Sequence, residues 1–319
     1  MMISVALCTY NGERYIRQQL VSILEQSLPP DEIVICDDRS TDHTLDIINE
    51  TVSASLIPCH IYKNDVNLGY KRNFEKVVSL CQGNIIFLSD QDDVWYKKKI
   101  ETVAKCFDDS SVMMVHHDDR LVDENLSTIY DSYWRAIGMP YTQMSKGDYR
   151  PLLLRNYVQG SACAFRKDVY EAAVPFNICV SHDTWLALFA IHMGKLISLN
   201  EPLMAYRQWG KNSMGVHIPT VLEKIKGYTN KLSYILKEHI ENLQSRVELF
   251  DDLEQRLVMQ KRNFLVPYSM HDIFKKRLDV ALANRTFTHL SYYYSYCGFK
   301  EDTKQLIKDY MSYFFYDRK

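Results

Sequence analysis

Clusters of acidic side chains occur at three places where a short apolar run of the chain ends. They are Asp37-Asp38 after residues 33–36, Asp90-Gln91-Asp92-Asp93 after residues 84–88, and His116-His117-Asp118-Asp119 at the end of residues 112–116. Carboxylates held close together repel each other unless a cation or hydrogen-bond donors compensate them. A divalent cation that prefers oxygen ligands, Mg or Mn, is the natural occupant of such a site.

Each cluster also has a simpler interpretation. Capping of a following helix explains Ser40 and Asp42, although it does not require the Asp pair before them. Residues 90–93 by themselves are also typical of a solvated acidic turn, but their position at a strand end favours a site. Because neighbouring strand residues point to opposite faces, His116 and His117 cannot easily hold one metal, and we expect them to be supporting or ordinary rim residues.

The elements that would position these clusters alternate between two hydrophobic periods. Short apolar runs predict strands, and apolar residues at helical spacing predict the helices between them. The expected strands are 3–8, 32–36, 57–62, 84–88 and 112–116, and the expected helices are 13–26, 42–52, 71–80 and 97–107. This alternation predicts an α/β fold with a doubly wound, mostly parallel sheet. Ligands of such a sheet bind beyond the carboxyl ends of its strands, where the acidic clusters lie.

The pattern changes after residue 120. Residues 120–157 are expected to form a long loop, followed by a strand at 158–165, a short helix at 167–173, a helix at 183–192 and a strand at 204–208. Long amphipathic helices, such as 234–257, then predict a C-terminal helical region. We therefore expect a domain at residues 1–218 and a helical region at 219–319.

Composition excludes several classes of protein. The 319 residues include 38 Lys and Arg and 40 Asp and Glu, so a net charge of -2 argues against a partner that is nucleic acid. None of the eight cysteines forms a C-x-x-C pair, which is typical of reduced, buried thiols in a cytoplasmic protein. Neither a signal peptide nor an apolar stretch of ~18 residues is apparent. Glycine-rich dinucleotide and P-loop motifs and the G-x-S-x-G elbow are also missing.

Several motifs together resemble the family-two inverting glycosyltransferases with the GT-A fold. The matching stretches are SVALCTYNG at 4–12, QSLP at 26–29, IVICDDRSTD at 33–42, NLG at 67–69 with Arg72-Asn73, and LSDQDDVW at 88–95. The resemblance covers about residues 2–216. Three motifs look most like the bacterial rhamnosyltransferase branch. They are LSDQDDVW at 88–95, HDTWLAL at 182–188 and Tyr206-Arg207-Gln208.

This resemblance implies a nucleotide-sugar site. Thr9, Asn11 and Glu13 would line the nucleoside pocket, and Asp38 would accept a hydrogen bond from the ring N–H of uracil or thymine. The resemblance assigns Arg72 and Asn73 to the surroundings of the base or the diphosphate.

It also implies a metal and a base. Asp92 is the first candidate for direct contact with Mg or Mn, and Asp90 would contact the ribose, the metal or its water. Asp183 matches the catalytic base, although a role as helix N-cap would also explain its position. His182 would orient the acceptor or tune Asp183. Gly160, in the sequence Gln159-Gly160-Ser161, and Trp185 would lie on the acceptor side.

One position departs from the family pattern. Trp209 stands where the family usually has a histidine that helps to hold the metal or diphosphate. An indole cannot ligate a metal, although its N–H can reach a phosphate. Arg207, Lys211 and His217 are the candidates to take over that contact.

The implied function is metal-dependent, inverting transfer of a sugar onto a glycan or lipid-linked acceptor in the synthesis of a bacterial surface polysaccharide, such as O-antigen or capsule. The implied donor is dTDP-L-rhamnose, with a UDP-hexose or a UDP-N-acetylhexosamine as alternatives. A nucleotidyltransferase and a non-catalytic module that binds nucleotide sugars or glycans are further alternatives. Residues 219–319 carry 17 basic and 13 acidic residues and many aromatic ones. This region is therefore expected to be a helical cap, a contact with the inner face of the plasma membrane, or a contact in a homo-oligomer.

Overall fold

A computed structural model of the chain describes residues 1–149, 151–152, 155–210, 232–259 and 275. The chain divides into two compact units, Met1–Val216 and His217–Lys319, close to the boundary expected at residue 218. In the second unit, the expected amphipathic stretch lies within helix α11 (Leu232–Met259). The remaining aromatic segments of this unit lie outside the described residues.

Nine strands of the first unit form one sheet. The strand order is β3-β2-β1-β4-β8-β6-β9-β5, with β7 paired to β6. The strands are β1 (Ile3–Thr9), β2 (Glu32–Asp37), β3 (Cys59–Lys63), β4 (Ile85–Ser89), β5 (Val94–Trp95), β6 (Val112–Val122), β7 (Thr128–Tyr130), β8 (Cys163–Arg166) and β9 (Lys195–Arg207). The strands from β3 to β4 in this order are parallel to one another. Beyond β4 the sheet is mixed, because β8 is antiparallel to both β4 and β6. The expected α/β class is confirmed.

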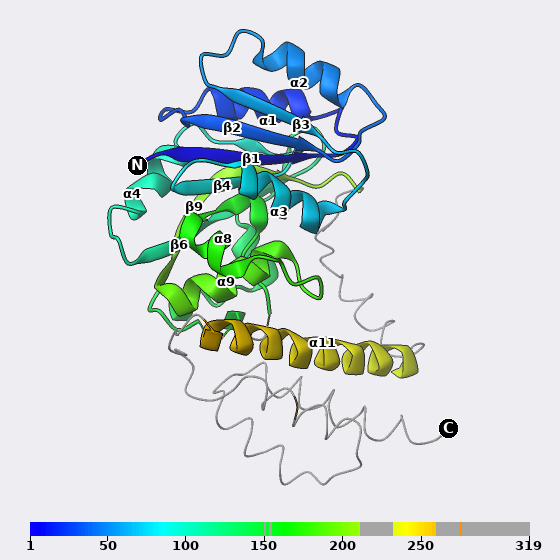
Figure 1. Cartoon of the computed structure of the whole chain (residues 1–319), viewed down its shortest axis with the longest axis vertical. Coiled ribbons are helices and arrows are strands. Elements are labelled where there is room, and N and C mark those ends of the chain that lie inside the picture. Colours follow the sequence, from blue (N-terminus) through cyan, green and yellow to red (C-terminus); the bar gives the residue numbers. More distant parts are fainter. Residues whose placement is uncertain (150, 153–154, 211–231, 260–274, 276–319) are drawn as a thin grey trace. The chain divides into compact units, whose positions relative to one another are not determined.

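Helices cover this sheet and bury its apolar side chains. They are α1 (Ile16–Leu24), α2 (Thr44–Val52), α3 (Tyr70–Leu80), α4 (Lys99–Cys106), α5 (Tyr133–Ile137), α6 (Tyr141–Met144), α8 (Lys167–Ala173) and α9 (His182–Met193). In Figure 1, α1 and α2 lie at the end of the unit that β2 and β3 form, and α8 and α9 lie at the other end. On β1 and β2, Val5, Leu7, Ile33 and Ile35 on one face and Ala6 and Val34 on the other face are all fully buried. Burial on both faces explains why these strands read as continuous apolar runs.

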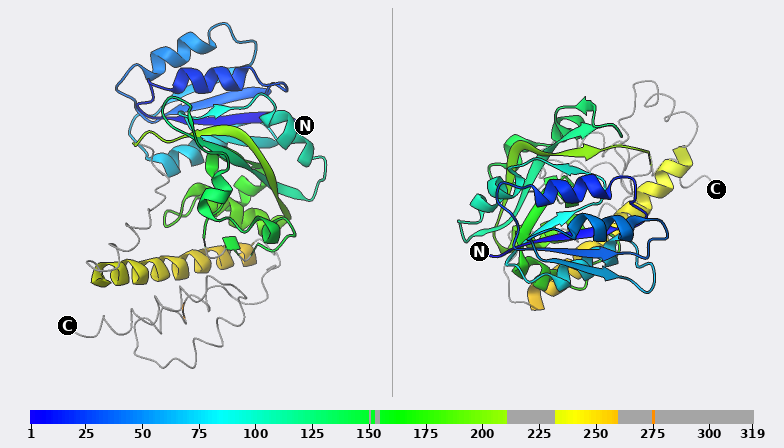
Figure 2. Two further views of the ribbon diagram at one scale, coloured as in Figure 1. Left: turned by 180° about the vertical axis from the view of Figure 1, so that it is seen from behind. Right: turned by 90° about the horizontal axis from the view of Figure 1, so that it is seen from above.

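Two long strands bring distant parts of the chain to the carboxyl ends of β1 and β4. β6 and β9 pair in parallel over most of their lengths, with register shifts at three points. Figure 2 shows β9 as a long, curved ribbon that runs from α9 toward the blue strands of the parallel half. Its last residue, Arg207, consequently reaches the turn between β4 and β5, where it contacts Asp92 and Asp93.

The structure corrects several expected boundaries. The strand expected at 112–116 continues to Val122, so His116 to Asp119 lie inside β6 and are buried there. The expected strand 158–165 begins instead with a 3-10 turn, Gly160–Ala162. The strand expected at 204–208 is the end of the much longer β9, and the expected loop 120–157 contains β7, α5 and α6. For β6 the cause is that buried polar residues, such as His116 to Asp119, do not produce the apolar pattern that predicts strands.

The beginning of α2 also differs from the expectation. Its N-cap is His43, not Ser40. Ser40 instead accepts a hydrogen bond from the backbone N–H of Asn11 at 2.8 Å and donates one to Asp37. Asp42 accepts from the backbone N–H of Thr44 at 3.0 Å and so still satisfies a donor of the first turn.

The described cysteines are free thiols, and most are buried, as expected. Burial raises the pKa of the Cys36 thiol to about 11. Within the part of the chain that the structure describes, no helix is both long and apolar enough to cross a membrane.

Candidate active site

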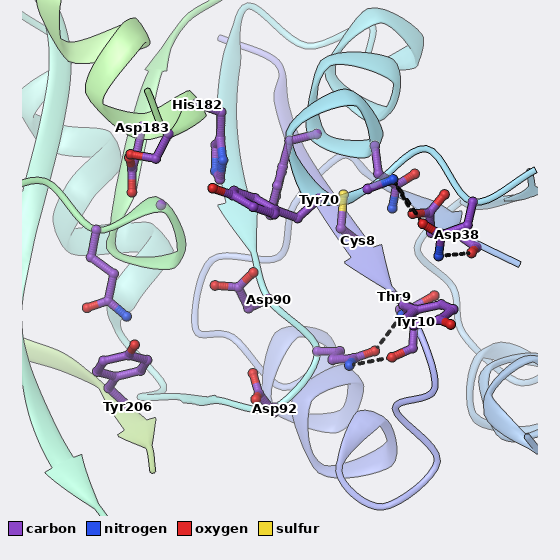
Figure 3. A pocket seen from close by; sticks show the side chains of 18 of the residues that line it. Cys8, Thr9, Tyr10, Asp38, Tyr70, Asp90, Asp92, His182, Asp183 and Tyr206 are labelled. Atoms are coloured by element: carbon purple, nitrogen blue, oxygen red, sulfur yellow. Dashed lines mark hydrogen bonds between the residues drawn. The ribbon is translucent and has the colours of Figure 1, made fainter. Parts of the chain in front are cut away.

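A cavity of about 280 Å³ opens at the carboxyl ends of β1, β2 and β4. Figure 3 shows Asp38, Asp90, Asp92, His182 and Asp183 around it. Thr9, Asn73, Gly160, Tyr206 and Trp209 line it as well. The tertiary structure therefore brings residues from opposite ends of the first unit into one site.

Asp38, at one end of the cavity, is held by three hydrogen-bond donors. Its Oδ1 accepts from the side chain of Asn64 and from the backbone N–H of Leu68, both at 2.7 Å. Its Oδ2 accepts from the backbone N–H of Gly69 at 2.9 Å. A carboxylate offers about four lone-pair sites, so Oδ2 retains one for a further donor. Asp38 thus both closes the loop before α3 and presents an acceptor at the cavity.

The other residues expected at the nucleotide have different surroundings. Thr9 donates to Asp37 at 2.9 Å, and buried Asn73 donates to the carbonyl of Cys36 at 3.0 Å; both line the cavity. Asn11, Glu13 and Arg72 are not among its lining residues. The Asn11 and Glu13 side chains accept from the backbone N–H groups of Thr41 and His43, and Arg72 pairs with Glu75.

Two acidic side chains of the β4–β5 turn face the cavity (Figure 3). Burial, and then the nearby Asp92 and Asp183 charges, raise the pKa of Asp90 to about 7. Burial also raises the pKa of Asp92, whereas the indole N–H of Trp209 opposes that shift. A cation beside these carboxylates would lower the free-energy cost of ionising them.

This pair of carboxylates fits a divalent cation. Among the described residues, no group of three His, Cys, Asp or Glu side chains is arranged to hold a metal. Mg²⁺ is commonly held by one or two carboxylates together with phosphate oxygens and water. Asp90 and Asp92 therefore suit a metal that arrives with a diphosphate, and they do not form an all-protein cage.

Arg207 and Trp209 hold the turn that carries Asp92. The Arg207 guanidinium donates to the backbone carbonyl of Asp92 at 2.8 Å and to Gln18 at 2.7 Å, and it is buried. This corrects the expectation for Arg207, because a buried guanidinium with these partners is not presented to a diphosphate. Trp209 donates its indole N–H to Oδ2 of Asp92 at 2.7 Å. Lys211 and His217 lie outside the residues that the structure describes.

A buried ionic group behind the turn was missed by sequence reasoning. Lys99, Asp93 and Asp119 are fully buried. Lys99 donates to the carbonyl of Ser161 at 2.6 Å, and its ammonium lies 3.7 Å from the ring centroid of Trp95. Burial lowers the pKa of Lys99 to about 7, although Asp119 and Asp93 oppose the shift. These residues begin the expected helix 97–107, and nothing in the run of three lysines at 97–99 marked the third one as buried.

Asp183 lies at the opposite end of the cavity from Asp38. It is the second residue of α9, whose N-cap is Ser181, so the alternative interpretation of Asp183 as the N-cap is wrong. Its Oδ1 accepts from Asn156 at 3.0 Å, from the backbone N–H of Thr184 at 2.6 Å and from Ser181. Within the described part of the chain, Oδ2 accepts no hydrogen bond. Such an oxygen at a cavity wall has the geometry of a proton acceptor.

His182 packs beside Asp183 as a neutral ring. It stacks on Phe74 with ring centroids 4.0 Å apart, and burial lowers its pKa. A Cβ on Gly160 would lie 2.8 Å from Nε2 of His182, so this turn requires glycine for close approach.

Trp185 does not belong to the cavity. It is fully buried, and its indole N–H donates to the carbonyl of Ala173 at 2.7 Å. The expectation that Trp185 contacts the acceptor is therefore corrected: this residue of α9 packs in the core against the end of α8. Tyr70 and Tyr206 line the cavity, and sequence reasoning assigned neither of them to the site, although Tyr206 belongs to one of the matching motifs. For Tyr206, its place beside Arg207 at a strand end was the available signal.

Curated relatives and solved structures resemble this chain. A dTDP-rhamnosyl transferase, RfbG of Shigella flexneri, is 31% identical over 66% of this chain and 74% of its own length. The chain spans between 58% and 74% of the length of five curated relatives that it matches.

Two solved structures share the fold. S. aureus TarS in complex with UDP-GlcNAc matches 97% of this chain and 81% of its own, with a TM-score of 0.57 and 15% identity. The mannosyltransferase PcManGT from Pyrobaculum calidifontis, in complex with GDP-Man and Mn²⁺, matches 99% of this chain and 87% of its own, with a TM-score of 0.53 and 15% identity. At such identities the likeness concerns the fold alone.

The family model described as glycosyl transferase family 2 matches residues 4–173, just over half of the chain. This match covers the acidic turn, strand β1 with Thr9, and strand β2 with Asp38 directly after it. Together with the RfbG relationship, it confirms the family expected from the motifs. The chain belongs to glycosyl transferase family 2.

Proposed function

We propose that this protein transfers a sugar from a nucleotide-sugar donor to a hydroxyl group of an acceptor, with inversion at the sugar C1. One observation carries the proposal: Asp38, the Asp90–Asp92 pair and Asp183 line a single cavity. These groups match the parts of a donor in order, namely the base, the diphosphate with its metal, and the reacting carbon.

The nucleotide end of the site is assigned to Asp38. A uracil or thymine ring presents an N–H between two carbonyl groups, and a carboxylate is a strong acceptor for that N–H. Thr9 and Asn73 line the same end of the cavity. The donor class is therefore a UDP- or dTDP-linked sugar.

Asp90 and Asp92 would hold Mg or Mn beside the diphosphate. A bound divalent cation offsets the negative charge that develops on a departing nucleoside diphosphate. The Mn²⁺ in the PcManGT complex supports this cofactor class for the fold.

Asp183 is assigned the role of general base. The acceptor oxygen attacks C1 of the sugar, its proton passes to Asp183, and the bond between C1 and the diphosphate oxygen breaks. The hydrogen bonds on Oδ1 fix the carboxylate and direct Oδ2 as the atom that takes the proton. His182, neutral and beside it, would orient the acceptor. Direct attack by the acceptor inverts the anomeric configuration.

L-Rhamnose from dTDP-L-rhamnose is the preferred donor sugar, supported by the printed function of RfbG. A UDP-hexose or UDP-N-acetylhexosamine is the alternative, and the UDP-GlcNAc complex of TarS supports it. The proposed acceptor is a glycan or a lipid-linked glycan of a bacterial surface polysaccharide, reached at the cytoplasmic face of the membrane.

The test combines a donor panel with one variant. The purified protein is incubated with dTDP-L-rhamnose, UDP-hexoses or UDP-N-acetylhexosamines and Mn²⁺, and sugar transfer or donor hydrolysis is followed by mass spectrometry. Asp183→Asn should lower turnover by ~100-fold to 10,000-fold while the donor still binds. Asp168→Asn, at an exposed acid in the first turn of α8, is the matched control and should retain activity.

Two results would count against the proposal. If no donor is bound or consumed, the enzymatic assignment fails. If Asp183→Asn retains full turnover, the assignment of Asp183 as the general base fails.

A further inference from the structure

Trp209 contacts the acidic turn through a polar atom as well as through its ring. Its indole N–H donates to Oδ2 of Asp92 at 2.7 Å. Its ring meets the edge of Tyr15, with centroids 5.2 Å apart and planes at 70°. The aromatic contact fixes the plane of the indole and so fixes the direction of the N–H.

The residues around Trp209 hold the same turn by its main chain. Arg207 donates from its side chain to the carbonyl of Asp92 at 2.8 Å and from its backbone N–H to Asp93 at 3.1 Å. The Arg207 guanidinium also lies 4.3 Å from the ring centroid of Tyr15. Residues at the end of β9 therefore hydrogen-bond to both the backbone and the carboxylate of Asp92. The Tyr15 ring contacts both of these residues, Arg207 and Trp209.

The chemistry of the indole decides what this contact can do. Its nitrogen is a donor only and has no lone pair for a metal. A donor that holds one oxygen of a carboxylate sets the direction in which the other oxygen points. Partners of this kind commonly raise the affinity of a metal site by orienting the ligands, without touching the ion.

We infer that Trp209 is a positioning residue that orients the Asp92 carboxylate toward a divalent cation in the cavity. The inference rests on the proposed function only in assigning Asp92 to the metal. Among the described residues, no third side chain is arranged to hold a metal with Asp90 and Asp92, and Trp209 acts through a hydrogen bond to one of these two carboxylates.

The first test measures metal binding and not sugar transfer. Mn²⁺ is titrated calorimetrically into the full-length protein in the presence of UDP. Trp209→Phe keeps an aromatic ring against Tyr15 but removes the N–H, and it should weaken Mn²⁺ binding roughly 10-fold to 100-fold. UDP binding without metal should be unchanged. Unchanged or tighter Mn²⁺ binding in this variant would overturn the inference.

A double-mutant cycle separates orientation from general damage. Asp92→Asn should itself weaken Mn²⁺ binding, and adding Trp209→Phe to it should cause little further loss, because the two residues act through one carboxylate. Equal losses in both backgrounds would contradict the inference. If Asp92→Asn does not change Mn²⁺ binding, the assignment of Asp92 to the metal in the proposed function fails. If Asp92→Asn weakens Mn²⁺ binding and Trp209→Phe does not, only the role of Trp209 fails.

Fluorescence provides a readout that does not depend on folding of Trp209→Phe. Adding Mg²⁺ and UDP should change the tryptophan emission of the wild-type protein, and Asp92→Asn should abolish that change. Trp134→Phe is the spectral control, because Trp134 is buried against His116 and is not among the lining residues of the cavity. A signal that disappears in Trp134→Phe, or that persists in Asp92→Asn, would refute the role of Trp209.

Discussion

At the scale of single residues, the cavity depends on how closely backbone and side chains approach one another. Asp183 and His182 begin α9, and Gly160 begins the 3-10 turn that faces them. A Cβ at position 160 would lie 2.8 Å from His182 and 3.8 Å from Asp183. The absence of a side chain at Gly160 therefore leaves room for the His182 ring, whereas the distance to Asp183 is an ordinary van der Waals contact.

Gly160→Ala should reduce catalysis more than donor binding. The new methyl group must displace the His182 ring, and an error of about 1 Å in such a group can cost ~100-fold in rate. We expect the kcat of the glycosyl transfer to fall by up to that factor, with little change in the KM for the donor. In a His182→Ala background the same substitution should cost much less, because the clashing ring is gone. An equal loss in both backgrounds would show that the clash is not the cause.

At the scale of elements, hydrogen bonds from the end of β9 connect the β4–β5 turn to α1. The buried Arg207 guanidinium donates to the Asp92 carbonyl at 2.8 Å, to Gln18 of α1 at 2.7 Å and to the Glu124 carbonyl at 2.5 Å. Removal of such a donor destabilises the folded protein, because water does not replace it at the buried acceptors.

Arg207→Met should therefore destabilise the protein by about 2–4 kcal/mol. Urea denaturation, followed by circular dichroism, measures the change. Arg14→Met is the matched control: Arg14 pairs with Glu124 at 2.9 Å, but the two side chains are 56% and 45% exposed. An exposed pair of this kind contributes at most about 1 kcal/mol. Similar losses for the two variants would contradict the role assigned to burial.

At the scale of the whole molecule, burial of histidines couples folding to pH. Burial lowers the pKa of His116 to about 3, while Nε2 of this residue lies 2.7 Å from the hydroxyl oxygen of Ser198. Burial also lowers the pKa of His117. Between the ordinary histidine pKa of about 6.5 and these lower values, the unfolded chain binds protons that the folded chain does not.

The stability contributed by neutral His116 is thus fully present above pH 6.5 and is lost as the pH falls toward 3. The free energy of unfolding should decrease by about 1.4 kcal/mol per pH unit for each such histidine. Urea titrations between pH 7 and pH 4 test this expectation, and His116→Gln should show a shallower slope. His43, whose side chain is 79% exposed, is the control, and His43→Gln should leave the slope unchanged. A slope that is identical in His116→Gln would refute the assignment.

The sequence by itself determined the α/β class, the parallel half of the sheet and the acidic residues at its strand ends. These features are local: continuous apolar runs predict buried strands, and polar residues directly after them lie at the edge where a parallel sheet binds ligands. Position after a strand or membership of a family motif identified five residues that line the cavity, namely Thr9, Asp38, Asp90, Asp92 and Asp183.

The tertiary structure alone decided which residues support those acids. Arg207 and Trp209 are more than 100 positions from Asp92 in the sequence, yet they hold its carbonyl and its carboxylate. Lys99 is fully buried, and Trp185 packs in the core rather than in the cavity. Burial and hydrogen bonding of this kind depend on the pairing of β9 with β6 and β5, which no short stretch of sequence encodes.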